Sequence, residues 1–156
     1  MKVSEALAER ADVVRRMGEV KSRATRCARY QEGEEPQESA LVLLERYLGL
    51  AKRLQVLTTQ LNVTNLSTVL PNGMTVTAAI ARRDVLSVTR KAVTEIADAA
   101  GPESDRYGFG RRRSELASKT DLRIPDLRQQ ADDLAREYRE LDNMIQASNF
   151  ATDLAG

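Results

Sequence analysis

Hydrophobic residues recur at helical spacing in four segments of the chain. Residues 125–148 and about 36–65 carry the clearest stripes, residues 77–100 use smaller apolar side chains, and residues 4–30 carry a weaker, alanine-rich stripe. Apolar residues three and four apart share one face of an α-helix, so each segment is predicted to be a helix. In residues 36–65 the stripe alternates spacings of four and three, as in a coiled coil, and three more leucines widen it toward a bundle face: Leu43, Tyr47, Leu50, Leu54, Leu57, Leu61 and Thr64, with Leu41, Leu44 and Leu48.

The helical spacing breaks at "TVLPNGMTVTAAIARRD", residues 68–84, between the second and third helices. Asn72-Gly73 is the dipeptide of a two-residue type I′ turn, in which both residues have positive φ. The β-branched residues on either side predict a β-hairpin over about residues 67–76. Such a ribbon needs support from another element, and residues 106–122, within an expected loop over 101–124, are the candidate third strand in this chain.

The expected architecture is a mainly α protein: an antiparallel four-helix, coiled-coil-like bundle with a short β-hairpin inserted between the second and third helices. The length of the chain suits a single helical domain over residues 1–156. Alanine-rich helices with apolar stripes on two sides bury little of that surface in a thin monomer. We therefore expect the chain to self-associate into a homo-oligomer.

The composition excludes several kinds of catalytic and metal-binding site. The chain has one cysteine and no histidine, which excludes disulfide frameworks, Cys/His zinc sites and histidine-based catalysis. No catalytic residue, metal site or cofactor is predicted. Asp132, Asp133 and Glu137 leave open a metal-binding or small-molecule-binding bundle, although adjacent residues point to different faces of a helix.

The N-terminal sequence and the apolar runs bear on the compartment. "MKVSEALAERADVV" has charges where a signal peptide needs an apolar segment, and the longest apolar run is only Ala40–Leu44. A membrane helix needs about 20 such residues. We expect a cytoplasmic protein with no membrane partner.

Arginines provide the candidate contacts with nucleic acid. The net charge is only +1, so any attraction for phosphates has to come from a local patch. Arg111, Arg112 and Arg113 follow Tyr107 and Phe109, a combination that binds phosphates and stacks on bases. A solvated loop is the favoured interpretation, and a nucleic-acid-binding module using this run and the basic first helix is the alternative.

A polar cluster is predicted around the hairpin. Asn62 and Asn65 share a helix face, and together with an arginine they could bind a carboxylate or a phosphate. We favour a structural interpretation instead. In it, Asn65 and Thr68 satisfy backbone groups at the helix end, and Asp84 pairs with an arginine of a neighbouring helix or chain. The candidate ligand or interface cluster is Asn62, Asn65, Thr68, Arg82, Arg83 and Asp84.

Several stretches together resemble a known family. "KVSEALAERADVVRRMGEVKSR", "QEGEEP", "NVTNLSTVLPNGMTVTAAIARRDVL", "DRY" and "QQADDLAREYRELDNMIQASNF" occur in this order. The chain resembles a small bacterial family of unknown function, some members of which are named septicolysin. The resemblance implies an all-α or mostly α protein and brings no established activity. The name suggests membrane lysis, but the chain has no tryptophan for an interface belt and no strand long enough for a transmembrane hairpin.

The sequence as a whole predicts a non-enzymatic, cytoplasmic structural or interaction protein that self-associates. The nucleic-acid-binding module and the ligand-binding or metal-binding bundle are the alternatives. None of these interpretations identifies a protein partner.

Overall fold

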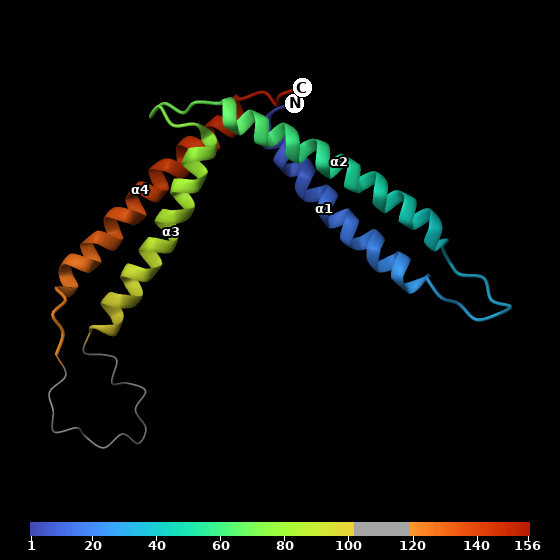
Figure 1. The fold of residues 1–156 in the computed structure, drawn as a ribbon, viewed down its shortest axis with the longest axis horizontal. Coiled ribbons are helices and arrows are strands. Elements are labelled where there is room, and N and C mark those ends of the chain that lie inside the picture. Colours follow the sequence, from blue (N-terminus) through green and yellow to red (C-terminus); the bar gives the residue numbers. More distant parts are fainter. Residues whose placement is uncertain (102–118) are drawn as a thin grey trace, which may run out of the picture. The chain divides into compact units, whose positions relative to one another are not determined.

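The computed structural model describes residues 1–101 and 119–156, and this part of the chain is all α. It contains four helices and no strand: α1 (Val3–Arg26), α2 (Ala40–Ser67), α3 (Val76–Ala99) and α4 (Ile124–Ala151) (Figure 1). The chain divides into two compact units. The first consists of Met1–Thr77 with Gln146–Gly156, and the second of Ala78–Ile145.

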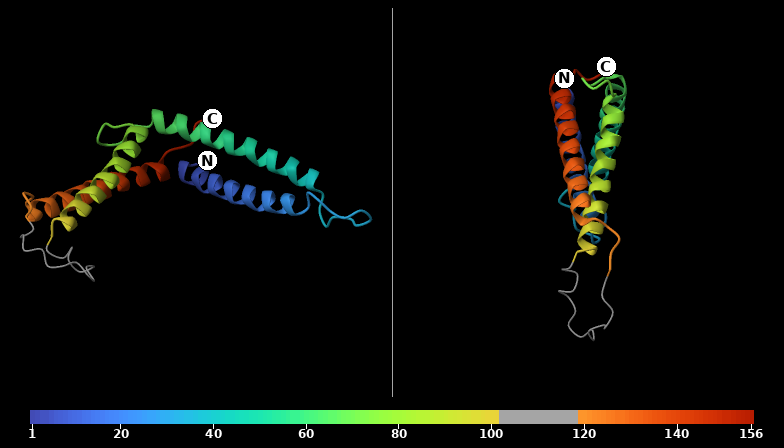
Figure 2. Two further views of the ribbon diagram at one scale, coloured as in Figure 1. Left: turned by 60° about the horizontal axis from the view of Figure 1, so that its bottom comes forward. Right: turned by 90° about the vertical axis from the view of Figure 1, so that its left-hand side faces the viewer.

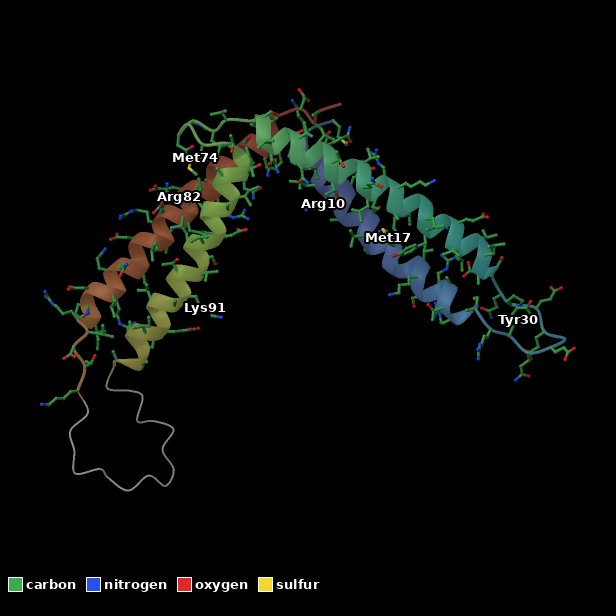
Figure 3. The ribbon with its side chains drawn as sticks, viewed as in Figure 1. Arg10, Met17, Tyr30, Met74, Arg82 and Lys91 are labelled. Carbon is green, nitrogen blue, oxygen red and sulfur yellow. The ribbon has the colours of Figure 1, made fainter. Side chains whose placement is uncertain are left out.

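In the first unit, α1 and α2 lie side by side and antiparallel (Figures 1 and 2). The start of α1 packs against the end of α2, and Met17, labelled in Figure 3, joins this core at its edge. Ala6 and Leu57 have no exposed surface, and both belong to this core. The core consists of Val3, Ala6, Val13, Leu57 and Leu61.

The loop between α1 and α2 is longer than the sequence suggested. α1 ends at Arg26 and α2 begins at Ala40, where helices over about 4–30 and 36–65 were expected. Ser39 explains the later start of α2, because its hydroxyl accepts a hydrogen bond of 3.4 Å from the Val42 N–H. A side-chain oxygen at this position satisfies one of the N–H groups that a helix leaves unpaired.

The two ends of the described chain are tied together in the first unit. The Val3 N–H donates to the Thr152 carbonyl (3.0 Å) and the Leu154 N–H to the Met1 carbonyl (2.9 Å), on either side of an antiparallel bridge between Lys2 and Asp153. Figure 1 shows the N and C labels close together. The residues before α1 and after α4 therefore form one backbone-paired junction.

The predicted β-hairpin between α2 and α3 is wrong. Residues 68–75 form a tight turn in which Val69 and Thr75 make a single isolated bridge. The turn is closed by hydrogen bonds from the Gly73 N–H to the Leu70 carbonyl (2.9 Å) and from the Leu70 N–H to the Met74 carbonyl (2.8 Å). Because α2 extends to Ser67 and α3 begins at Val76, too few residues remain for two strands.

The predicted type I′ turn is wrong for a related reason. Gly73 has a φ of 81°, but no residue other than glycine has positive φ in the described ranges, so Asn72 does not. The Asn72 side chain instead accepts a hydrogen bond of 3.1 Å from the Met74 N–H. A β-turn followed by one left-handed glycine is the common geometry of a slightly longer reversal. The candidate third strand over 106–122 lies mostly outside the described residues.

In the second unit, α3 and α4 run side by side (Figures 1 and 2). Arg82, near the start of α3, pairs with Glu137, whereas Asp98, near its end, pairs with Arg128 at the start of α4. These cross-connections show that the two helices are antiparallel. The buried residues here are mostly small or medium-sized: Ala79, Leu86, Ala97, Ala135, Leu141 and Ile145.

The fold class is therefore corrected to all-α in the described part of the chain, without a hairpin between α2 and α3. The packing of all four helices in one antiparallel bundle stays a prediction. Within residues 1–101 and 119–156, no helix has both the length and the apolar character needed to cross a membrane.

Candidate functional site

The predicted polar residues at the end of α2 belong to the first unit. Thr68 caps the helix: its N–H donates to the Thr64 carbonyl (2.9 Å), and its own carbonyl accepts from the Val76 N–H (3.0 Å). Asn62 is exposed and Asn65 is half-buried. Thr68 makes both contacts with its backbone, so a capping role for the side chains of Asn65 and Thr68 stays a prediction.

Thr64 has a role at the same helix end that the sequence did not reveal. It is only 3% exposed, its hydroxyl donates to the Gln60 carbonyl (2.7 Å), and the same oxygen accepts a hydrogen bond from the Ala155 N–H (2.9 Å). This contact spans 91 positions in the chain. Thr64 thus anchors the residues that follow α4, and no spacing pattern in the sequence indicates such a pairing.

Arg82, Arg83 and Asp84 belong to the second unit, where both arginines bind carboxylates of α4. Arg83 is 23% exposed and donates to Asp142 (3.0 Å) and to its neighbour Asp84 (2.9 Å). The hydrogen bond to Asp84 raises the pKa of the Arg83 guanidinium, an effect that burial partly opposes. Arg82, labelled in Figure 3, pairs with Glu137.

These ion pairs change the interpretation of the predicted cluster. Asp84 pairs with the adjacent arginine of its own helix, rather than with an arginine of a neighbouring helix or chain. An anionic ligand would have to displace Asp142 or Asp84 from Arg83, because the guanidinium already binds both. The convergence of Asn62, Asn65 and Thr68 with these arginines on one ligand stays a prediction.

The candidate nucleic-acid contacts are only partly described. Arg111, Arg112 and Arg113 lie outside the described residues. On the basic first helix, Arg15 binds Asp12 and Glu19, while Arg23 binds Glu38 from the following loop. Arg15 and Arg23 of α1 therefore already pair with carboxylates of the same unit.

Acidic residues form no metal site in the described ranges. No group of three or more histidine, cysteine, aspartate or glutamate side chains there could hold a metal ion. Of the carboxylates once considered for this role, Glu137 binds Arg82 and Asp133 binds Arg136. These ion pairs explain the acidic face of α4.

An exposed apolar surface lies on the side of α2 turned away from its core. Six apolar residues on it are between 47% and 66% exposed. At 100° per residue they fall within about one-third of the helix circumference, opposite Leu43, Leu57 and Leu61. We call this surface the outer face of α2, and it consists of Leu41, Leu44, Leu48, Val56, Val63 and Leu66. The sequence pattern identified its first three leucines as a widening of the stripe and missed the other three.

A groove lies beside the first turns of this face. Its volume is about 430 Å³, and small or apolar residues from both helices line most of it, with Lys21 at its rim: Lys21, Ala24, Thr25, Ala28, Ala40, Leu44 and Tyr47. Leu44 belongs to both the groove and the outer face. The small residues of α1 leave this space open, because alanine side chains fill little of the gap next to Leu44 and Tyr47.

Comparison with protein families gives one assignment for nearly the whole chain. Residues 10–154 match DUF6847, described as a family of unknown function. The chain belongs to DUF6847. Among solved structures, it is similar to the "Crystal structure of a functionally unknown conserved protein from Corynebacterium diphtheriae", with 34% identity over 99% of both chains and a TM-score of 0.88. The comparison with curated proteins gave no match.

Membership of DUF6847 confirms the expected family of unknown function, but the septicolysin name is not supported. Neither DUF6847 nor the similar crystal structure brings an activity to this chain. Any assignment of function therefore has to start from the surfaces of the molecule itself.

Proposed function

We propose that this member of DUF6847 is a non-enzymatic, self-associating structural or interaction protein of the cytoplasm. The observation that supports this function is the outer face of α2, on which six apolar side chains are about half exposed. Scattered apolar residues are normal on protein surfaces, but exposed apolar residues that gather on one side of a helix are typical of an interaction site, here at both ends of α2 with polar residues such as Lys52 between them.

The size of the hydrophobic effect favours association. Complete burial of a leucine or valine side chain stabilises by about 1.5–3 kcal/mol, so burying the remaining half of six such side chains gives roughly 5–10 kcal/mol per copy. Two copies that bury this face together would gain about twice that amount, against an association cost of about 4–15 kcal/mol. The free energy gained by burying this face therefore supports association, whereas in a single chain the six side chains stay exposed to water.

The ion pairs of α1 argue against the nucleic-acid alternative. Arginines that hold Asp12, Glu19 and Glu38 would have to break these pairs to bind phosphates. Binding of single-stranded DNA or RNA that weakens steeply with salt, and that falls when Arg111, Arg112 and Arg113 are replaced by alanine, would favour that alternative instead.

Light scattering coupled to size exclusion tests the proposed function. The wild-type chain is expected to have a molar mass above the 17.3 kDa of one copy at micromolar concentration. The double variant Leu44→Glu/Leu48→Glu places two charges on the outer face and is expected to shift the mass to one copy. Val88→Glu is the matched control, because Val88 is 71% exposed on α3, and its mass is expected to stay that of the wild type.

Two results would contradict the proposal. If the wild-type protein had the molar mass of one copy at micromolar concentration, the proposed self-association would be wrong. Dissociation by Val88→Glu, with no effect of the α2 variant, would move the interface to α3. Circular dichroism at 222 nm confirms that each variant keeps its helices.

A further inference from the structure

Four of the six residues of the outer face of α2 are placed symmetrically about the middle of the helix. A two-fold axis between two antiparallel helices sets each residue opposite its mirror position along the helix. On this face, Leu41 mirrors Leu66 and Leu44 mirrors Val63, and in both pairs the two residue numbers add to 107. The ends of α2, residues 40 and 67, have the same sum. Two such helices would therefore overlap along their whole length of about 42 Å.

We infer that a second copy of this chain docks on the outer face of α2 in an antiparallel orientation, with Leu41 opposite Leu66 and the two-fold axis between positions 53 and 54. The inference rests on the proposed self-association and adds the partner's orientation and register. Nearer the axis, Ala51 falls opposite Val56, and Leu48 falls opposite Thr59. Apolar or small residues thus meet at Leu41, Leu44 and Ala51, and polar side chains such as Thr59 also lie on the contact.

The groove beside α2 fits this arrangement. The groove lies at the N-terminal end of α2, next to Ala40 and Leu44. An antiparallel partner brings the last turns of its own α2 to the same place, including Leu66, which is 66% exposed in the single chain. Leu66 of the second copy is the large apolar side chain nearest to a groove lined by small residues. By symmetry, each copy fills the groove of the other.

The exposed apolar surface supports this pairing. The six residues of the outer face are each between 47% and 66% exposed in the single chain. Packing against a second copy would remove this apolar surface from water, which is favourable. Burial of the two grooves would add to the buried area.

The polar residues on the contact favour the antiparallel register over the parallel one. In a parallel pair, Lys52 would face Lys52 and Glu45 would face Glu45, and like charges directly opposite destabilise an interface. In the antiparallel register, Lys52 falls opposite Gln55, and Glu45 falls opposite Asn62. The two lysines are then offset by three residues, about 4.5 Å along the axis, and their long side chains can extend into water.

Cysteine crosslinking tests the orientation and register directly. In a Cys27→Ser background, Lys52→Cys places a thiol next to the axis, so a short bis-maleimide is expected to link two copies of this variant. Leu41→Cys is expected not to link to itself, because 25 residues separate positions 41 and 66 and the two thiols lie about 38 Å apart. A mixture of Leu41→Cys and Leu66→Cys chains is expected to give the heterodimer. Leu41 and Leu66 are each 66% exposed, Lys52 is exposed, and serine is close to cysteine in size at position 27, so the fold should tolerate the changes.

The outcomes separate this inference from the proposed function. Linkage of Leu41→Cys to itself would show a parallel pair and overturn the inference. An oligomeric protein by light scattering without any of the expected links would also overturn it, but would leave self-association intact. A molar mass equal to that of one copy would overturn both the antiparallel pairing and the proposed self-association. Nitroxide labels on the same cysteines give an independent distance measurement, expected to be short at position 52 and long at position 41.

Two binding experiments test whether a lipid surface or a different protein, rather than a second copy, occupies the outer face of α2. Binding of phosphatidylcholine vesicles by a single-copy protein, lost in Leu48→Glu, would place a lipid surface on the outer face. A stoichiometric complex with a different purified protein that excludes the Lys52→Cys crosslink would place that protein there. Either result would overturn the inference.

Discussion

Thr64→Val should release the end of the chain from α2. Thr64 is 3% exposed, and its hydroxyl oxygen accepts the hydrogen bond of 2.9 Å from the Ala155 N–H. Valine has nearly the same shape, so packing is preserved while the acceptor is lost. An N–H left without a partner in a buried site costs about 1–3 kcal/mol. Since Ala155 is only half-buried, we expect the lower end, about 1 kcal/mol, or roughly 2–4 °C in melting temperature.

Thr58→Val is the matched control for this prediction. Thr58 is a half-buried threonine of α2 whose hydroxyl, like that of Thr64, donates to the carbonyl four residues earlier, at 2.8 Å. Within the described residues it makes no hydrogen bond to the residues after α4. Urea denaturation at one fixed protein concentration should show a larger loss of stability for Thr64→Val. Amide hydrogen exchange should accelerate at Leu154 and Ala155 in that variant alone. Equal losses in both variants, with unchanged exchange at the two amides, would refute the assigned role of Thr64.

Three further predictions concern the fold. Gly73→Ala should destabilise by about 1 kcal/mol in urea denaturation, because φ is 81° there, whereas Gly18→Ala in the open interior of α1 should stabilise by up to about 1 kcal/mol; the opposite order would contradict the turn geometry. Leu57→Ala, at a fully buried site, should cost about 2–5 kcal/mol, and a cost below 1 kcal/mol would contradict the core assignment. The hydrogen bond from Arg23 lowers the pKa of Glu38 from its ordinary value of 4.5, so the pair stabilises above that pH and is lost as the pH falls through the lower, folded-state value. The stability difference between wild type and Glu38→Gln should therefore shrink from pH 7 to pH 3, and a difference that persists at pH 3 would contradict this.

The helices could be predicted from the sequence because their signal is local. Apolar residues three and four apart define one face, and this spacing identified segments that match α1 to α4 to within about four residues at each end. The boundaries depend on individual capping groups. Ser39 sets the start of α2, but a serine is equally compatible with a loop, so the spacing alone placed the helix four residues too early.

The turn between α2 and α3 shows where local signals fail. Asn72-Gly73 and its β-branched neighbours favour a hairpin when considered alone. The helices on both sides extend to Ser67 and from Val76, and their backbone hydrogen bonds take up the residues that strands would need. Tertiary context thus overrode β-propensity, as is common for short segments.

The candidate site could be predicted in its residue types but not in its pairings. The sequence suggested that Asp84 would pair with an arginine of a neighbouring helix or chain, but Asp84 pairs with Arg83 of its own helix, and Arg83 also binds Asp142 on α4. The pairing of Arg83 with Asp142 depends on the register between α3 and α4. The two residues lie 59 positions apart in the chain, and no short motif encodes such a pairing. The contact between Thr64 and Ala155 was invisible for the same reason.

The outer face of α2 could be predicted from the sequence only in part. Leu41, Leu44 and Leu48 stood out as a second stripe, because leucines are conspicuous at helical spacing. Val56, Val63 and Leu66 did not, because Lys52, Gln55 and Thr59 interrupt the pattern on the same side of the helix. Only the burial of the opposite face shows that all six residues remain exposed together.

The molar mass of the untagged wild-type protein in solution is the most direct test of the central claim that the outer face of α2 joins two copies of the chain. Light scattering at micromolar concentration is predicted to give twice the 17.3 kDa of one chain, and Leu44→Glu/Leu48→Glu is predicted to halve that value. A mass of 17.3 kDa for the wild type under these conditions would contradict the claim.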